Sequence, residues 1–174
     1  GVKQPGPLSK WGDIAPDKGV CTDPVIRAMR RAGIDLQWLV HLDMLEDQKK
    51  PDGKKLYPWG KWKKKKADAN IDHRRAPILA RYLELHGESL TTGTATGDIG
   101  AWQPGDVVHW DLGNGRFHVG VVSDSIGESG LPGVVHNYPD PGYSCEEDAL
   151  ERVEIVGHYR YPAAGDPVPL VPEP

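Results

Sequence analysis

The spacing of apolar residues changes near residue 100, and this change limits the possible folds more than any other feature of the chain. In the first half, apolar residues recur about every 3.6 residues, which predicts helices over roughly 21–32, 36–48 and 77–87. In the second half, apolar and polar residues alternate, which predicts strands at about 106–111, 116–123, 133–137 and 152–160. Helices followed by strands predict an α+β fold, with the N-terminal helices packed on an antiparallel sheet that is connected as a meander.

Length and composition predict a single domain. With 174 residues, of which 38% are hydrophobic, the chain can bury one sizeable core. We assign residues 1–18 to an irregular lead-in, residues 19–161 to the domain, and residues 162–174 to a Pro-rich tail. Residues 49–66 (KKPDGKKLYPWGKWKKKK) mix nine lysines with turn-forming residues, which predicts a long exposed loop. Solvation accounts for this lysine run more simply than binding of an anionic polymer or a sugar does.

Charge and hydropathy set expectations about partners and location. The net charge of −4 is mild and spread along the chain, so we expect no nucleic-acid partner. No stretch approaches the roughly 20 apolar residues of a membrane span, so we expect no membrane insertion. The first residues show no signal-peptide pattern, but residue 1 is Gly rather than Met, and we expect that a targeting segment has been trimmed from the chain.

Cys21 is the candidate nucleophile. It precedes Thr22, Asp23 and Pro24, of which Thr22 or Asp23 is expected to cap the first helix, while Pro24 suits the first helical turn. The positive end of a helix lowers the pKa of a thiol, and the thiolate is the nucleophilic form. A buried, unreactive thiol is the alternative that the position alone leaves open. Cys145 lies among carboxylates, which raise a thiol pKa, and a disulfide between the two cysteines would abolish the proposed chemistry.

His118 is the candidate general base. Strand alternation places His118 and Gly120 on one face and Val119 on the other, which is the core face. Because Gly120 has no side chain, we expect the helix end that carries the thiol to approach the imidazole closely. The group that orients the imidazole is expected on the next strand, where His136 and Asn137 lie on opposite faces. A hydrogen-bonded or surface histidine without catalytic function is the alternative.

The polar segment 70–75 (NIDHRR) directly precedes a predicted helix. We assign Asp72, His73 and Arg74 to substrate binding, together with Asp23 beside the nucleophile. Either arginine of the segment can hold a substrate carboxylate through two hydrogen bonds. Helix capping with a surface ion-pair network is the simpler interpretation of the same residues.

Several motifs taken together resemble a known superfamily. The segments CTDPVIRAMRRAG, QPGDVVHW, HVGVV and VVHN occur here in the order in which similar segments occur in NlpC-type cell-wall peptidases, which are papain-like cysteine enzymes. More narrowly, GVCTD, NIDHRR, ESLTT, WQPGD, HVGVVSD and GHYRY resemble an uncharacterised bacterial family within that superfamily. Where the better known members have Ser-Gly after the cysteine, this chain has Thr-Asp-Pro, which bears on substrate preference more than on mechanism.

The resemblance implies a papain-like fold and a cysteine peptidase or amidase that needs no cofactor. It places the nucleophile on Cys21, the base on His118 and the orienting group on His136, with Asn137 as the alternative. It implies hydrolysis of an amide bond through a thioester. The implied substrate is the peptide stem of peptidoglycan, and the implied protein is a secreted or periplasmic monomer.

Two other functions remain open. One is a zinc-dependent hydrolase, because His109, His118 and His136 lie on predicted neighbouring strands and Cys21 can add a thiolate, although no HExxH or CxxC spacing is present. The other is a papain-like binding module that has lost its activity.

Overall fold

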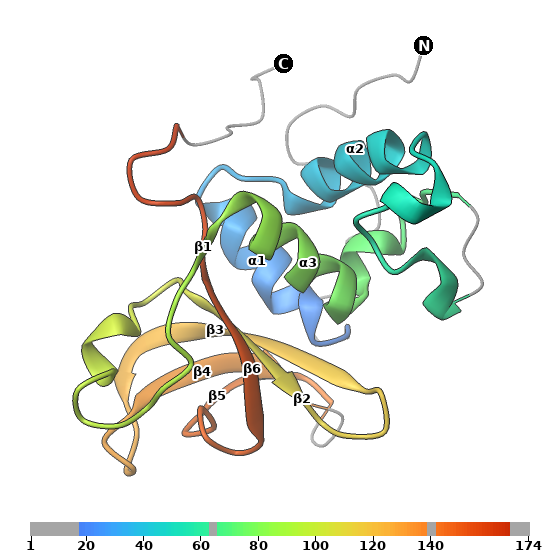
Figure 1. The fold of residues 1–174 in the computed structure, drawn as a ribbon. Coiled ribbons are helices and arrows are strands. Elements are labelled where there is room, and N and C mark those ends of the chain that lie inside the picture. The colour runs from blue at the N-terminus through green and yellow to red at the C-terminus, as the bar shows by residue number, and fades with distance from the viewer. Residues whose placement is uncertain (1–17, 63–65, 139–141, 168–174) are drawn as a thin grey trace.

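The computed structural model describes residues 18–62, 66–138 and 142–167 (Figure 1). In these residues the helices are α1 (Thr22–Arg31), α2 (Leu36–Gln48) and α3 (Ala76–His86), with short 3₁₀ turns at η1 (Asp52–Lys54), η2 (Trp59–Trp62), η3 (Asp72–Arg74) and η4 (Ile99–Ala101). The strands are β1 (Glu88–Ser89), β2 (Val107–Asp111), β3 (Phe117–Ile126), β4 (Pro132–Asn137), β5 (Ser144–Glu147) and β6 (Glu154–Arg160). The predicted α+β class is confirmed.

The strands form one antiparallel sheet in the order β1-β6-β2-β3-β4-β5. The strands β2 to β5 follow one another as the predicted meander does. The last strand, β6, instead returns to the free edge of β2, so the predicted meander is wrong for this strand. The sequence did not predict β1 and β5, because strands of two and four residues are too short to show a clear alternation.

The helices α1 and α3 cover one face of the sheet, with α1 lying against β3 and β4, and α2 packs on α1, α3 and η3 (Figure 1). Val25 of α1 and Leu79 of α3 are fully buried in the core beneath them. Val119 and Val121 of β3 join the same core, so the prediction that this side of the strand faces the core is confirmed. This packing holds the first turn of α1 against the sheet.

A second apolar cluster covers the opposite face of the sheet. It includes Trp110, Val134 and Leu150. A Cβ atom added at Gly120 would lie 2.5 Å from Val134 Cγ1 and 3.2 Å from a ring carbon of Trp110. Gly120 therefore makes room for this second core and not for the end of α1, and the predicted role of this glycine is wrong. The reason is that both faces of β3 are buried, so the face opposite the helices is filled by other side chains.

The start of α1 differs from the predicted cap. Cys21 itself is the N-cap residue, and no side chain caps the helix. The Asp23 carboxylate turns back and accepts a hydrogen bond of 2.6 Å from the N–H of Val20. The predicted capping by Thr22 or Asp23 is wrong, and the thiol-bearing residue forms the mouth of the helix.

The described part of the lysine-rich segment is mostly exposed, as its composition predicts, but Asp47 anchors its middle to the core. Asp47, at the end of α2, is fully buried and accepts hydrogen bonds from the N–H groups of Leu56 and Tyr57 and from Trp59 Nε1 at 2.7 Å. Tyr57 and Trp59 are consequently buried, with exposed fractions of 4% and 8%. Residues 63–65 of the run lie outside the described residues, as do most of the predicted lead-in and tail.

Within the described ranges, none of the helices combines the length and the apolar character that crossing a bilayer requires.

Candidate active site

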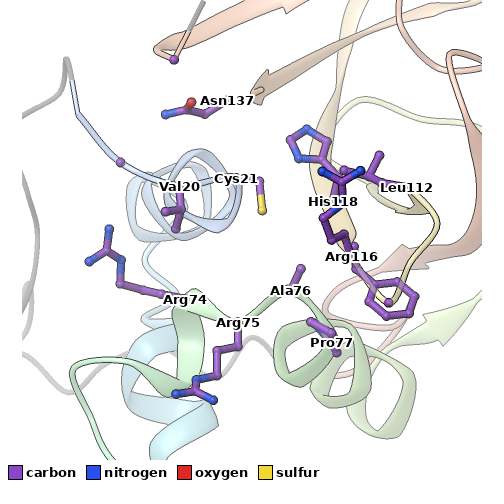
Figure 2. A pocket seen from close by; sticks show the side chains of 14 residues that line it. Val20, Cys21, Arg74, Arg75, Ala76, Pro77, Leu112, Arg116, His118 and Asn137 are labelled. Atoms are coloured by element: carbon purple, nitrogen blue, oxygen red, sulfur yellow. The ribbon is translucent and has the colours of Figure 1, made fainter. Parts of the chain in front are cut away.

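A cavity of about 580 Å³ lies between the start of α1, the start of α3 and the first residues of β3 (Figure 2). Cys21 and His118 both line it (Figure 2). Arg74 and Arg75 form the wall opposite the imidazole, and Arg116 lies beside it. The structure therefore brings the predicted nucleophile and the predicted base to one cavity.

Cys21 is half-buried at the helix mouth. Burial raises the pKa of the Cys21 thiol above its ordinary value, and the Asp23 carboxylate adds to this effect. The N–H groups of Val119, Cys21 and Thr22 lower the same pKa but do not outweigh burial. The expectation that the helix end would produce a low thiol pKa is therefore wrong for the unliganded protein, because desolvation opposes the charged form more strongly than nearby N–H dipoles favour it.

His118 is buried and neutral. Its ring stacks on Trp110 with ring centroids 5.4 Å apart. Burial is the main cause that lowers the pKa of His118 to about 3, and the electrostatic effects of His136 and Arg152 act in the same direction. The imidazole is therefore available as a proton acceptor at any physiological pH. Within the described part of the chain, no hydrogen bond joins this imidazole to the Cys21 thiol.

A chain of hydrogen bonds orients His118. Its Nε2 atom lies 2.8 Å from Nδ1 of His136, and Nε2 of His136 lies 2.8 Å from a carboxylate oxygen of Glu147. Arg152 donates to the same oxygen of Glu147 at 2.7 Å, and this bond lowers the pKa of Glu147 below its ordinary value. Glu147 is therefore ionised and accepts hydrogen bonds only.

The ionised carboxylate decides both tautomers. Because Glu147 can only accept, His136 carries its proton on Nε2 and presents an unprotonated Nδ1 to His118. His118 must then carry its own proton on Nε2, which leaves Nδ1 unprotonated. Nδ1 of His118 is thus the basic atom of the site.

The structure distinguishes the two candidates for the orienting group. His136 pairs with Gly120 across β3 and β4, so it shares the sheet face of His118 and bonds to it. Asn137 points to the other face and lines the cavity. Its side-chain Nδ2 is buried and has no hydrogen-bond partner among the described residues, so Asn137 does not orient His118.

The residues assigned to substrate binding separate into two groups. Arg74 lines the cavity and forms an ion pair of 3.1 Å with Asp23. Asp23, Asp72 and His73 are buried and do not line the cavity. The Asp72 carboxylate accepts from the N–H of Asp68 at 2.6 Å, which indicates that it shapes the turn before α3.

The four residues of the zinc alternative do not converge. His109 pairs with Val119 and therefore lies on the helix-facing side of β2, whereas His118 and His136 lie on the other side. Among the described residues, the group with metal-ligand atoms close together is a different one and comprises His136, Cys145 and Glu147.

Two residues of the site escaped the sequence analysis. Glu147 lies in β5, where no strand was predicted, and Arg152 lies at the start of the predicted strand 152–160, so nothing in the pattern connected them with His136. Both cysteines are free.

Comparison with known proteins identifies the family. Residues 9–161 match the model of a domain of unknown function, DUF1287, and the chain belongs to this family. The chain is also 44% identical over 150 residues to the uncharacterized protein YijF of Escherichia coli (strain K12), covering 86% of this chain and 67% of that protein. No solved structure matches the chain significantly.

Proposed function

We propose that this protein is a papain-like cysteine hydrolase that cleaves an amide bond through a thioester intermediate. The observation that supports the proposal best is the shared cavity, which is lined by a thiol at a helix N-terminus and by a histidine oriented by His136 and Glu147. A nucleophile, a base and a third group that holds the base are the parts that covalent acyl transfer requires. The order of motifs that resembles the NlpC-type peptidases agrees with this assignment of residues.

The proposed reaction starts from neutral partners. As the Cys21 sulfur attacks the substrate carbonyl, its proton passes to Nδ1 of His118, and the bond between carbonyl carbon and sulfur forms. The oxyanion is held by the N–H of Cys21 at the positive end of α1. The imidazolium then returns the proton to the leaving nitrogen as the C–N bond breaks, and water hydrolyses the thioester with His118 again as base. We expect substrate binding to bring the Cys21 thiol within hydrogen-bonding distance of His118, because catalytic hydrogen bonds often shorten only when substrate is bound.

Peptidoglycan stem peptides are the substrate class that we propose. Arg116 lines the cavity, and no Asp or Glu is among its described lining residues, so the cavity suits a substrate with a free carboxylate, although Arg74 already pairs with Asp23. Arg116 is exposed at the rim, and Arg74 and Arg75 lie on the opposite wall. Stem peptides carry such carboxylates, and the resemblance to NlpC-type enzymes points to the same polymer. The location that follows is periplasmic or secreted.

The test is digestion of purified muropeptides followed by mass spectrometry. Wild type is expected to release peptide fragments, Cys21→Ala is expected to release none, and Cys145→Ala is the matched cysteine control that should keep activity. If wild type leaves muropeptides intact but cleaves another amide or a thioester, the substrate assignment is wrong and the chemistry stands.

One observation favours a non-catalytic binding module, namely the raised pKa of the Cys21 thiol. Because burial raises the pKa of the Cys21 thiol and lowers that of His118 to about 3, the neutral thiol and the neutral imidazole are the resting forms of the two groups. The rate of Cys21 alkylation by iodoacetamide should therefore rise steadily with pH between about pH 5 and pH 8, without the plateau that a stable thiolate–imidazolium pair produces. If the protein is a cysteine hydrolase, His118→Ala should slow this alkylation. Equal reactivity of Cys21 and Cys145 would support the binding module.

A further inference from the structure

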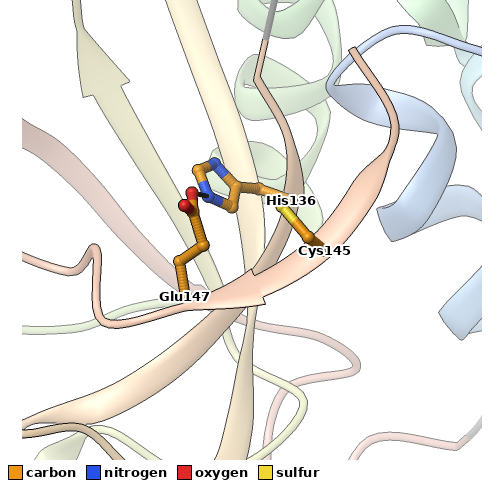
Figure 3. A group of neighbouring side chains, drawn as sticks. All are labelled: His136, Cys145 and Glu147. Atoms are coloured by element: carbon orange, nitrogen blue, oxygen red, sulfur yellow. Dashed lines mark hydrogen bonds and ion pairs between the residues drawn. The ribbon is translucent and has the colours of Figure 1, made fainter. Parts of the chain in front are cut away.

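A second group of chemically reactive side chains lies on the sheet face opposite the helices. Cys145 of β5 pairs directly with His136 of β4, and Glu147 follows two residues later on the same side (Figure 3). One ligand atom from each of the three residues lies within 4.8 Å of the other two. Cys145 and Glu147 are half-buried, so an ion can reach them from solvent, while His136 is buried behind them.

The three side chains form a ligand set suited to zinc. Thiolate sulfur, imidazole nitrogen and carboxylate oxygen are the groups that bind Zn²⁺ in proteins. Tetrahedral coordination by three protein ligands leaves a fourth position for water. Arg152 already binds the Glu147 carboxylate at 2.7 Å, and its positive charge weakens attraction for a cation. The arrangement thus suits reversible binding better than a permanent structural ion.

We propose that His136, Cys145 and Glu147 form a Zn²⁺ site, and that the bound ion switches off the base of the catalytic cavity. The first half of the proposal is independent of the enzyme's activity. The second half rests on the proposed function, because it requires His118 to act as base.

The switch follows from the tautomers of the two imidazoles. In the metal-free protein both His136 and His118 carry their protons on Nε2, because Glu147 accepts from His136. An ion bound to Nε2 of His136 replaces that proton, so neutral His136 must carry its proton on Nδ1. His136 then donates to Nε2 of His118, and the proton of His118 moves to Nδ1. That atom can no longer accept the proton of Cys21.

The protons balance in this exchange. Each imidazole holds one proton before and after the ion binds, and only its position on the ring changes. The Cys145 thiol loses its proton to solvent when it binds the ion as thiolate, so binding should weaken as the pH falls. No oxidation or bond cleavage is involved.

Binding is tested with Co²⁺ and Zn²⁺ on the Cys21→Ser protein, which removes the other thiol. One equivalent of Co²⁺ is expected to bind and to show sulfur-to-cobalt charge-transfer absorption, and excess Zn²⁺ should displace it. The double variant Cys21→Ser/Cys145→Ser, checked for native circular dichroism, should lose this absorption. Absence of stoichiometric binding to Cys21→Ser, or an unchanged spectrum in the double variant, overturns the site.

The switch is tested by alkylation of Cys21, quantified by peptide mass spectrometry with and without Zn²⁺. Zinc is expected to slow alkylation at least ten-fold in wild type and to have no effect in Cys145→Ala. The switch is wrong if Co²⁺ binds through Cys145 and His118→Ala slows alkylation of Cys21, but zinc leaves the rate of this alkylation in wild type unchanged. If His118→Ala also has no effect, the proposed catalytic function fails and the metal site stands.

Discussion

Mild acid should destabilise this protein through its buried neutral histidines. Burial lowers the pKa of His118 to about 3 and that of His73 to about 4. In the unfolded chain both groups have a pKa of about 6.5, so the unfolded state binds more protons below that pH. The stability gained by keeping these groups neutral is complete above about pH 6.5 and is lost as the pH falls toward the folded-state values.

The size of the effect follows from the two pairs of pKa values. Between pH 7 and pH 5, each histidine lowers the free energy of unfolding by about 2 kcal/mol, and the two together by about 4 kcal/mol. Burial also lowers the pKa of His136, which adds to the loss with the same sign. Asp47 and Asp106, whose pKa values are lowered from about 3.8, contribute only below this range. A loss of this size is a large part of the 5–15 kcal/mol that is typical of domains.

Urea unfolding at pH 7 and pH 5, followed by tryptophan fluorescence, measures this change. The variants His118→Gln and His73→Gln should each reduce the loss between the two pH values by about 2 kcal/mol, whatever their effect on absolute stability. A wild-type loss below about 1 kcal/mol, or an unchanged pH dependence in both variants, would refute the argument that these imidazoles are held neutral.

Three further substitutions test the packing and the hydrogen-bond chain. Glu147→Gln should slow alkylation of the Cys21 thiol about 10–100-fold, since an amide can donate to His136 and so allow His118 to carry its proton on Nδ1. An unchanged rate would show that the carboxylate does not orient His118. Asp47→Ala should lower the free energy of unfolding in urea by about 3–5 kcal/mol, because it leaves buried donors unpaired. The control is Asp52→Ala at a fully exposed position, which should lower it by less than about 0.5 kcal/mol. Similar losses at both positions would contradict the role of Asp47 as a buried hydrogen-bond acceptor. Gly120→Ala should destabilise the protein by about 1–3 kcal/mol through overpacking. The control is Gly97→Ala, where an added Cβ has no atom within 4 Å, and it should be neutral. A neutral result at both positions would mean that the second apolar cluster accommodates the extra methyl group.

The helices and the central strands were predictable because they depend on local pattern. The predicted range 36–48 coincides with α2, and the other helices begin and end within one or two residues of the prediction. Their apolar faces are long enough for the period to be unambiguous. The alternation in β3 likewise predicted which of its residues face the helices.

The failures occurred where burial depends on a partner distant in the sequence. The described part of residues 49–66 is mostly exposed, as its composition predicts, but the Asp47 carboxylate binds the N–H groups of Leu56 and Tyr57 and the ring of Trp59, so two aromatic side chains are buried. The thiol of Cys21 has the helix position that lowers a pKa, but its burial against the sheet raises it instead. Neither effect can be predicted from the residues that are adjacent in the sequence.

The sequence by itself determined the class of fold, the candidate thiol and the two histidines, because periodicity and residue chemistry are properties of short segments. The hydrogen bond of His118 to His136 rather than Asn137 depends on the tertiary structure, since these neighbours point to opposite faces and the register between β3 and β4 selects one. The tertiary structure likewise brought Glu147, Arg152 and Cys145 to His136 through a short strand with no recognisable pattern. Protonation states and ligand sets depend on distances between segments, and those distances exist only once the chain has folded.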